Sequence, residues 1–206
     1  MLQTVTATHS LDRWLAGTFF LRRRMVLCIL AAFLIMLWSV PAQAGPNDKP
    51  SEYDVEAAYL FNFSKFITWP ADSGTQGGGS LSICVLGDDP FGPALDKIVT
   101  GEEVAGKSVV DKRITRSEEA SSCSILYISA SEASRLSRIL LAVKDAPVLT
   151  VSDLPDFLDR GGMIQFVLRD NRVRFAVNLA PTQHDGLALS SELLKVAVSV
   201  RRAEGR

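Results

Sequence analysis

The fold of this chain is constrained most strongly by three short apolar runs, LSICVLG (81–87), CSILYIS (123–129) and PVLTVSD (147–153). Continuous apolar runs of this length are typical of strands buried on both faces of a sheet. Residues 163–179 then alternate apolar and polar side chains around Asp170-Asn171, as a β-hairpin does. With helical segments between the strands, the sequence predicts an α/β fold: a single domain with a mixed β-sheet of about five or six strands flanked by helices.

The first expected helix follows the GPNDKP segment. Ser51 and Asp54 form a capping box at its start, and Pro70 ends the element. Its aromatic residues fall mostly at helical spacing and indicate core packing, with a partner-binding surface as the alternative. Four more helices are expected at residues 90–99, 131–145 (with Ser131 as N-cap), 154–162 and 187–202, and a further strand near residues 107–114.

The N-terminus has the order of charge, apolar core and small residues that marks a secretory signal peptide. Arg22, Arg23 and Arg24 precede the apolar run 25–40, which is shorter than the roughly 20 residues of a spanning helix, and Ala42-Gln43-Ala44 follows. We therefore expect a signal peptide over residues 1–44, with cleavage after Ala44; a retained N-terminal anchor is the alternative. The remaining chain divides into a linker (45–52), one α/β domain (53–200) and a tail (201–206).

Residues 45–206 carry 18 basic and 22 acidic side chains, a net charge of −4. A mildly acidic chain without a basic run disfavours nucleic acid and anionic membrane surfaces as partners. Of the three cysteines, Cys28 lies in the apolar run of the signal peptide, so Cys84 and Cys123 remain. In an exported protein such a pair predicts a disulfide. Two buried free thiols are the alternative, and a catalytic thiol is disfavoured because no histidine lies nearby in the sequence.

Polar residues follow the three apolar runs, where ligands of open α/β sheets tend to bind. They are Gly87, Asp88 and Asp89 after the first, Ser129 and Ser131 after the second, and Ser152 and Asp153 at the end of the third. We expect a ligand site near Asp88, Asp89 and Ser129, with turn formation before Pro90 as the alternative role of the two acids. His184 is expected to be a surface residue. The sequence has no phosphate-binding loop, metal-ligand spacing or nucleophile elbow, so we expect no catalytic residues, no metal and no cofactor.

Six segments in this order resemble the YfiR-like family of small periplasmic proteins, over about residues 53–198: VEAAYLFNFSKFITWP, LSICVLGDDPFGPALDKI, CSILYIS, VLTVSD, GGMIQFVLRDNRVRFAVNL and GLALSSELLKVAV. The resemblance implies a periplasmic regulator that binds the periplasmic sensory domain of an inner-membrane diguanylate cyclase and represses it. Release of that block raises cyclic di-GMP and promotes biofilm formation. Relatives tend to dimerise, which implies a homodimer here. Cys84 and Cys123 match one disulfide of the family, and a second pair found in some relatives has no counterpart.

Two functions remain from different classes. The first is this periplasmic repressor, which would contact its receptor through exposed apolar residues of the first or last helix. The second is a solute-sensing domain, with its ligand near Asp88, Asp89 and Ser129, that acts on a membrane receptor kinase or another partner.

Overall fold

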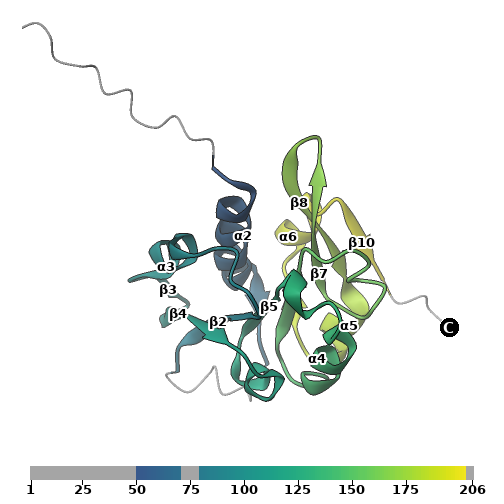
Figure 1. Cartoon of the computed structure of the whole chain (residues 1–206), viewed down its shortest axis with the longest axis horizontal. Helices are drawn as coiled ribbons and strands as arrows, with labels where there is room; N and C mark the ends of the chain where they lie inside the picture. Colours follow the sequence, from purple (N-terminus) through teal and green to yellow (C-terminus); the bar gives the residue numbers. More distant parts are fainter. Residues whose placement is uncertain (1–49, 71–78, 203–206) are drawn as a thin grey trace, which may run out of the picture. The chain divides into compact units, whose positions relative to one another are not determined.

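The apolar runs form the centre of an eight-stranded mixed sheet in the computed structural model, which describes residues 50–70 and 79–202 (Figure 1). The strand order is β10-β8-β7-β6-β5-β2-β4-β3, and β4, β2, β5, β6 and β7 run parallel. The hairpin strand β8 is antiparallel to β7, and β3 is antiparallel to β4. The strands are β2 (Leu81–Leu86), β3 (Glu103–Val104), β4 (Lys107–Ile114), β5 (Ile125–Ile128), β6 (Leu149–Ser152), β7 (Ile164–Arg169), β8 (Arg172–Asn178) and β10 (Ser199–Arg201).

The mixed α/β fold is confirmed, with eight strands in the sheet where five or six were expected. The two additional strands, β3 and β10, are two and three residues long and lie at the two edges of the sheet. Strands this short carry too few residues to show an alternating pattern. A separate two-stranded pair joins β1 (Ile67–Thr68) to β9 (Ala188–Leu189).

The helices are α2 (Glu52–Phe66), α3 (Pro93–Val99), η2 (Ser117–Ser122), η3 (Ala130–Glu132), α4 (Leu136–Ala142), α5 (Leu179–His184) and α6 (Ser191–Val196), where η denotes a 3₁₀-helix. The capping box predicted for α2 is present: the Ser51 hydroxyl accepts from the Asp54 N–H, and the Asp54 carboxylate accepts from the Ser51 N–H. Within the described ranges, no helix has both the length and the apolar composition that crossing a bilayer requires. The predicted signal peptide lies outside the described residues.

Three of the expected helices differ from the structure. Residues 155–161 form turns, because Asp156 adopts a positive φ of 58° that a right-handed helix cannot contain. The helix expected over 131–145 begins only at Leu136, since the Ser131 hydroxyl accepts from the Asp88 N–H and does not cap a helix. The closing helix ends at Val196, and the chain then enters β10, which pairs with β8.

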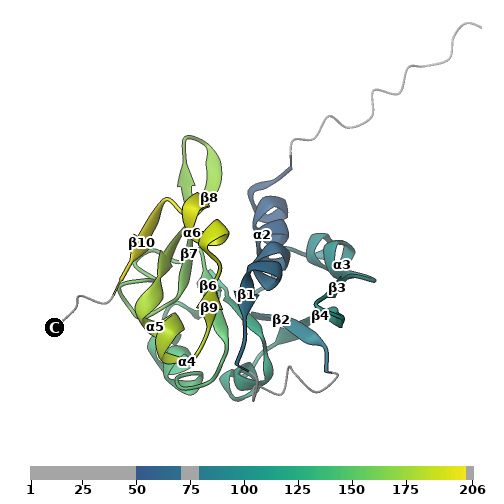
Figure 2. The ribbon, with the colours of Figure 1, turned by 180° about the vertical axis from the view of Figure 1, so that it is seen from behind.

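Alternate residues of each central strand face two different cores. Ile83 of β2 belongs to the cluster under α2, α3 and α6, whereas Cys84 belongs to the cluster under η2 and α4. Figures 1 and 2 both show α2 beside α6, in agreement with their contacts. The sheet therefore lies between two helical layers, and each layer buries one face of it.

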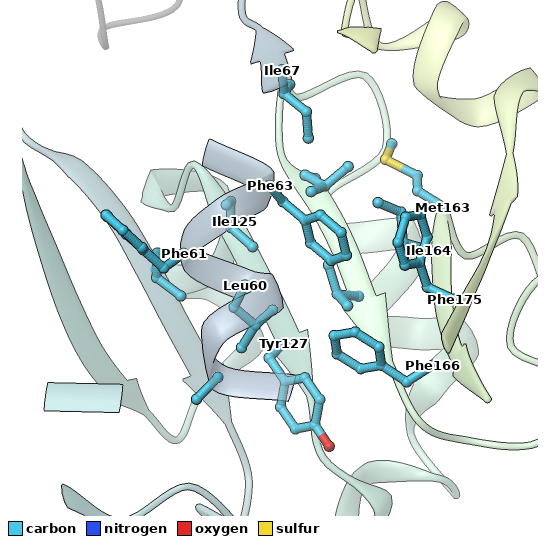
Figure 3. Packing of buried hydrophobic residues seen from close by; sticks show 14 of the residues in the cluster. Leu60, Phe61, Phe63, Ile67, Ile125, Tyr127, Met163, Ile164, Phe166 and Phe175 are labelled. Atoms are coloured by element: carbon cyan, nitrogen blue, oxygen red, sulfur yellow. The ribbon is translucent and has the colours of Figure 1, made fainter. Parts of the chain in front are cut away.

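Four aromatic rings form the centre of the α2 core. Phe63 stacks on Phe166 at 5.9 Å between ring centroids and meets Phe175 edge-on at 5.1 Å, while Tyr59 contacts all three rings. Figure 3 shows Phe63, Phe166 and Phe175 between the helix and the sheet, with the Tyr127 hydroxyl pointing away from Leu60. Such ring pairs stabilise a core beyond their buried area.

Candidate functional site

The carboxyl edge of the parallel strands is where this topology places a ligand crevice. β2 has β4 on one side and β5 on the other, so the strand order reverses at β2. In open α/β sheets, ligands bind outside the carboxyl ends of the strands at such a switch point. The residues that follow β2, β5 and β6 here are Gly87, Ser129 and Asp153.

Asp88, Asp89 and Ser129 lie at this edge, and each residue makes at least one hydrogen bond within the protein. Asp89 accepts a hydrogen bond from the Phe91 N–H and one from the Arg113 Nε–H, each at 2.9 Å. The Ser129 N–H donates to the Leu86 carbonyl at 3.0 Å, and only 6% of the residue is exposed. These contacts order the turn after β2. Ligand binding by Asp88, Asp89 and Ser129 stays a prediction.

A second group of polar side chains meets on the α2 side of the same edge. Glu56 of α2 is only 2% exposed although it is an acid, and its Oε2 has no hydrogen-bond partner. Asp153, directly after β6, likewise has a buried Oδ1 without a partner. Both residues line a cavity of about 350 Å³ with Glu52, Pro155 and residues 165–168 of β7. We call it the acidic cavity.

The electrostatics of the acidic cavity follow from its burial. Burial first, and then the charges of Asp153 and Glu52, raises the pKa of Glu56 to about 8. Burial also raises the pKa of Tyr127, and the neighbouring charges of Asp153 and Glu56 and a hydrogen bond to Asp153 raise it further. The pKa of Tyr53 is raised by the same kinds of cause. Glu56 is therefore mostly protonated at neutral pH.

The disulfide lies on the opposite face of the sheet. Cys84 in β2 and Cys123 before β5 are bonded to each other, with their Cα atoms 6.0 Å apart. Both are buried in the core under η2 and α4. The bond thus joins the middle of β2 to the segment that enters β5, toward the amino ends of these two parallel strands.

A comparison with protein families decides which family this fold represents. The family model described as YfiR/HmsC-like matches residues 53–198, which cover almost all of the described domain. The chain belongs to the YfiR/HmsC-like family. The resemblance found in the sequence is confirmed, and the matched range includes the disulfide and, apart from Glu52, all lining residues of the acidic cavity of this YfiR/HmsC-like domain.

Two solved structures show weak likenesses to this YfiR/HmsC-like chain. One is a conserved domain protein from Vibrio cholerae O1 biovar eltor, with 11% identity and a TM-score of 0.49, over 73% of this chain and 60% of that one. Another is the ABC domain in complex with L-Trp from Streptococcus pneumonia, with 13% identity and a TM-score of 0.44, over 58% of this chain and 55% of that one. At TM-scores below 0.5, neither likeness bears on function. No curated protein matches the chain.

One of the two buried acids of the acidic cavity in this YfiR/HmsC-like protein was identified from the sequence. Asp153 stands out because it follows an apolar run. Glu56 was missed because it follows two other acids, which lie in the first turn of α2. Its spacing gives the available signal: positions 56, 60 and 63 share one helix face, and Leu60 and Phe63 are core residues. An acid on the apolar face of a helix is rare without a partner.

A third group lies elsewhere in the YfiR/HmsC-like domain. His184 is exposed, and its Nδ1 lies 2.8 Å from Asp185 and 3.5 Å from Asp145. These three side chains could offer ligand atoms to a metal ion. His184 is a surface residue, as the sequence predicts, and an exposed acidic group of this kind is common without a metal.

Replacement of Glu56 by glutamine should remove a pH-dependent loss of stability from this YfiR/HmsC-like protein. The folded protein holds a proton on Glu56 up to about pH 8, whereas an unfolded glutamate loses it near about pH 4.3. Between these values the folded state binds more protons than the unfolded state, so the free energy of unfolding falls as pH rises.

Urea unfolding at several pH values between 5 and 8 checks this prediction. As pH rises, the free energy of unfolding of the wild type should fall relative to that of Glu56→Gln, by at most about 1.4 kcal/mol per pH unit. Asp88→Asn serves as the control, since it removes an exposed acid at the same edge. A pH-independent difference for Glu56→Gln would contradict the buried, protonated state.

Proposed function

We propose that this protein is a periplasmic regulator that binds the periplasmic sensory domain of an inner-membrane diguanylate cyclase and represses it, thereby lowering cyclic di-GMP. The observation that carries the proposal is the YfiR/HmsC-like family match over residues 53–198. On this proposal the protein acts by binding and not by catalysis. A protein that binds only the inactive conformation of a receptor shifts its population toward that conformation.

The proposed receptor contact is the surface of α2 and of the segment that contains α6. These elements are in contact with each other, and exposed apolar residues lie on both. Tyr53 and Phe66 are 39% and 40% exposed on α2, and Val196 and Val198 are 60% and 43% exposed at and after the end of α6. The presence of exposed apolar side chains on these two adjacent elements supports this surface as the contact.

In-cell crosslinking of a tagged copy tests the function, followed by mass spectrometry of the captured proteins. We expect capture of a membrane diguanylate cyclase, and raised cyclic di-GMP in a strain that lacks the gene. A charge at the centre of the contact should disrupt it, so Val196→Asp should weaken capture by about tenfold or more.

Leu141→Asp is the matched control. Leu141 is 70% exposed on α4, which packs on the other face of the sheet, so this variant should capture the cyclase as the wild type does. Capture of no membrane signalling protein, together with unchanged cyclic di-GMP, would refute the proposal. If Val196→Asp and Leu141→Asp reduced capture of the cyclase equally, the proposed contact surface would be refuted, but the repressor function would not.

Solute sensing is the second candidate function. The acidic cavity favours it, because Glu56 and Asp153 line a space of about 350 Å³, and each has a buried carboxyl oxygen without a partner. Ligand binding and repression can coexist, since a ligand that prefers one conformation would change the affinity for the receptor.

A further inference from the structure

The described residues that line the acidic cavity include acidic side chains and no basic side chain. Glu52, Glu56 and Asp153 line it. In the part of the chain that the structure describes, no basic side chain forms an ion pair with any of these three carboxyl groups. Buried carboxylates are costly unless they are paired or hydrogen-bonded. A cationic ligand would supply the missing partner.

Once Glu56 is ionised, the unpartnered oxygen atoms can accept hydrogen bonds from donors on that ligand. Glu56 Oε2 and Asp153 Oδ1 are buried and accept no hydrogen bond. Glu56 is 2% exposed and lines the cavity, so its unpartnered oxygen belongs to a built site and not to the open surface. An ammonium group offers several N–H donors to carboxylates, and such charge-assisted hydrogen bonds are short and strong.

The remaining walls of the cavity are largely apolar. Pro155, Phe166, Val167 and Leu168 contribute carbon surface, and Gln165 adds one amide. A volume of about 350 Å³ lies at the lower end of the range for small-molecule sites. These walls favour an organic body of modest size over a bare ion.

We propose that the acidic cavity binds a small organic amine, with its ammonium group between Glu56 and Asp153 and its carbon skeleton on Phe166 and Leu168. This gives the ligand class for the sensing function proposed above. The geometry favours an amine over a metal ion. Among the described residues, the His, Asp and Glu side chains that converge closely enough to share a metal are Asp145, His184 and Asp185, and none of these lines the acidic cavity.

Binding of an ammonium group expels the proton from Glu56. The proton is held there by burial and by the charges of Asp153 and Glu52. A positive charge beside Glu56 reverses this balance, and the carboxyl group ionises. At pH 7 an alkyl amine is protonated, because its pKa is about 10.4 in the lysine side chain. The affinity should therefore rise as pH increases from about 6 to about 8.

Isothermal titration calorimetry of the purified protein tests the proposal, with phenethylamine, tyramine and cadaverine as probes and 2-phenylethanol as the uncharged counterpart. We expect at least one amine to bind and the alcohol to bind about tenfold or more weakly. In two buffers of different ionisation enthalpy, up to about one proton should be released per amine at pH 7.

Two variants locate the site. Glu56→Gln keeps the size and the uncharged state of this side chain at neutral pH. It should fold as the wild type does, lose about tenfold or more in amine affinity and release no proton. Asp153→Asn should also weaken binding, whereas Glu102→Gln, at an exposed acid outside the cavity, should not.

The proposal is overturned if none of the three amines binds, if the alcohol binds as tightly, or if Glu56→Gln retains the affinity and the proton release. Loss in Asp88→Asn alone would place the ligand at the turn after β2. Binding of Ca²⁺ or Mg²⁺ that excludes the amines would make the cavity a metal site. Each of these measurements omits the cyclase, so failure here leaves the repressor function standing.

Discussion

Reduction of the Cys84–Cys123 disulfide should lower the free energy of unfolding by about 4 kcal/mol. The bond spans a sequence separation of 39 residues and joins β2 to the segment before β5. Without the bond, the unfolded chain has more conformational entropy, which favours unfolding. Urea unfolding monitored by circular dichroism, with and without reductant, measures the change.

The double variant Cys84→Ala/Cys123→Ala is the control for this experiment. It should unfold at about the urea concentration of the reduced wild type and should not respond to reductant. Because both cysteines are buried, alanine leaves a small gap, so the variant should be slightly less stable than the reduced protein. Equal stability of the oxidised and reduced wild type would contradict a stabilising role for the bond.

Truncation of Phe63 to alanine should cost about 3–5 kcal/mol of stability. Phe63 is fully buried, and its ring contacts Tyr59, Phe166 and Phe175. The variant loses the transfer free energy of the ring and leaves a cavity between α2 and the sheet. Thermal and urea unfolding of the purified variant measure the loss.

Phe66→Ala is the matched control on the same helix. Phe66 is 40% exposed, so its truncation should change the free energy of unfolding by less than about 1 kcal/mol. A similar loss for both variants would mean that the two aromatic residues do not differ in burial. That result would contradict the orientation of α2 on the sheet.

The elements predicted well from the sequence are those with strong local patterns. The three apolar runs became β2, β5 and β6, and the alternating segment around Asp170 and Asn171 became the hairpin of β7 and β8. In these elements, burial on one or both faces determines the residue at nearly every position. Four of the six segments that carry the family resemblance contain these strands, and the other two contain most of α2 and all of α6.

The elements predicted poorly depend on tertiary contacts. Gly87 approaches the Ser131 hydroxyl so closely that a Cβ atom would collide with it, and the hydroxyl binds the Asp88 N–H. That contact draws Ser131 away from the cap of α4. Val198 and Val200 were predicted to be helical. Instead, Val198 precedes β10 and Val200 lies within it, because the edge of β8 offers hydrogen bonds there. Neither contact is local in the sequence.

The acidic cavity also depends on contacts between residues that are distant in the sequence. Asp153 was noted at the end of its strand, whereas Glu56 belongs to a helix nearly 100 residues earlier in the chain. Only the packing of α2 over β5 and β6 brings the two carboxyl groups together with Tyr127. A sequence pattern can show that an acid lies on the apolar face of a helix, but it cannot show which other acid lies beside it in the fold.

The ring contacts of Phe63 with Phe166 and Phe175 join the first helix of the domain to the hairpin near its end. During synthesis α2 emerges first, and its aromatic partners follow only about 100 residues later, after most of the sheet has been made. Contacts so distant in sequence make folding slow, because a long loop must close before they form. A chain cut short before β7 therefore leaves the apolar face of α2 open to water, and such a fragment should be held by chaperones or should aggregate.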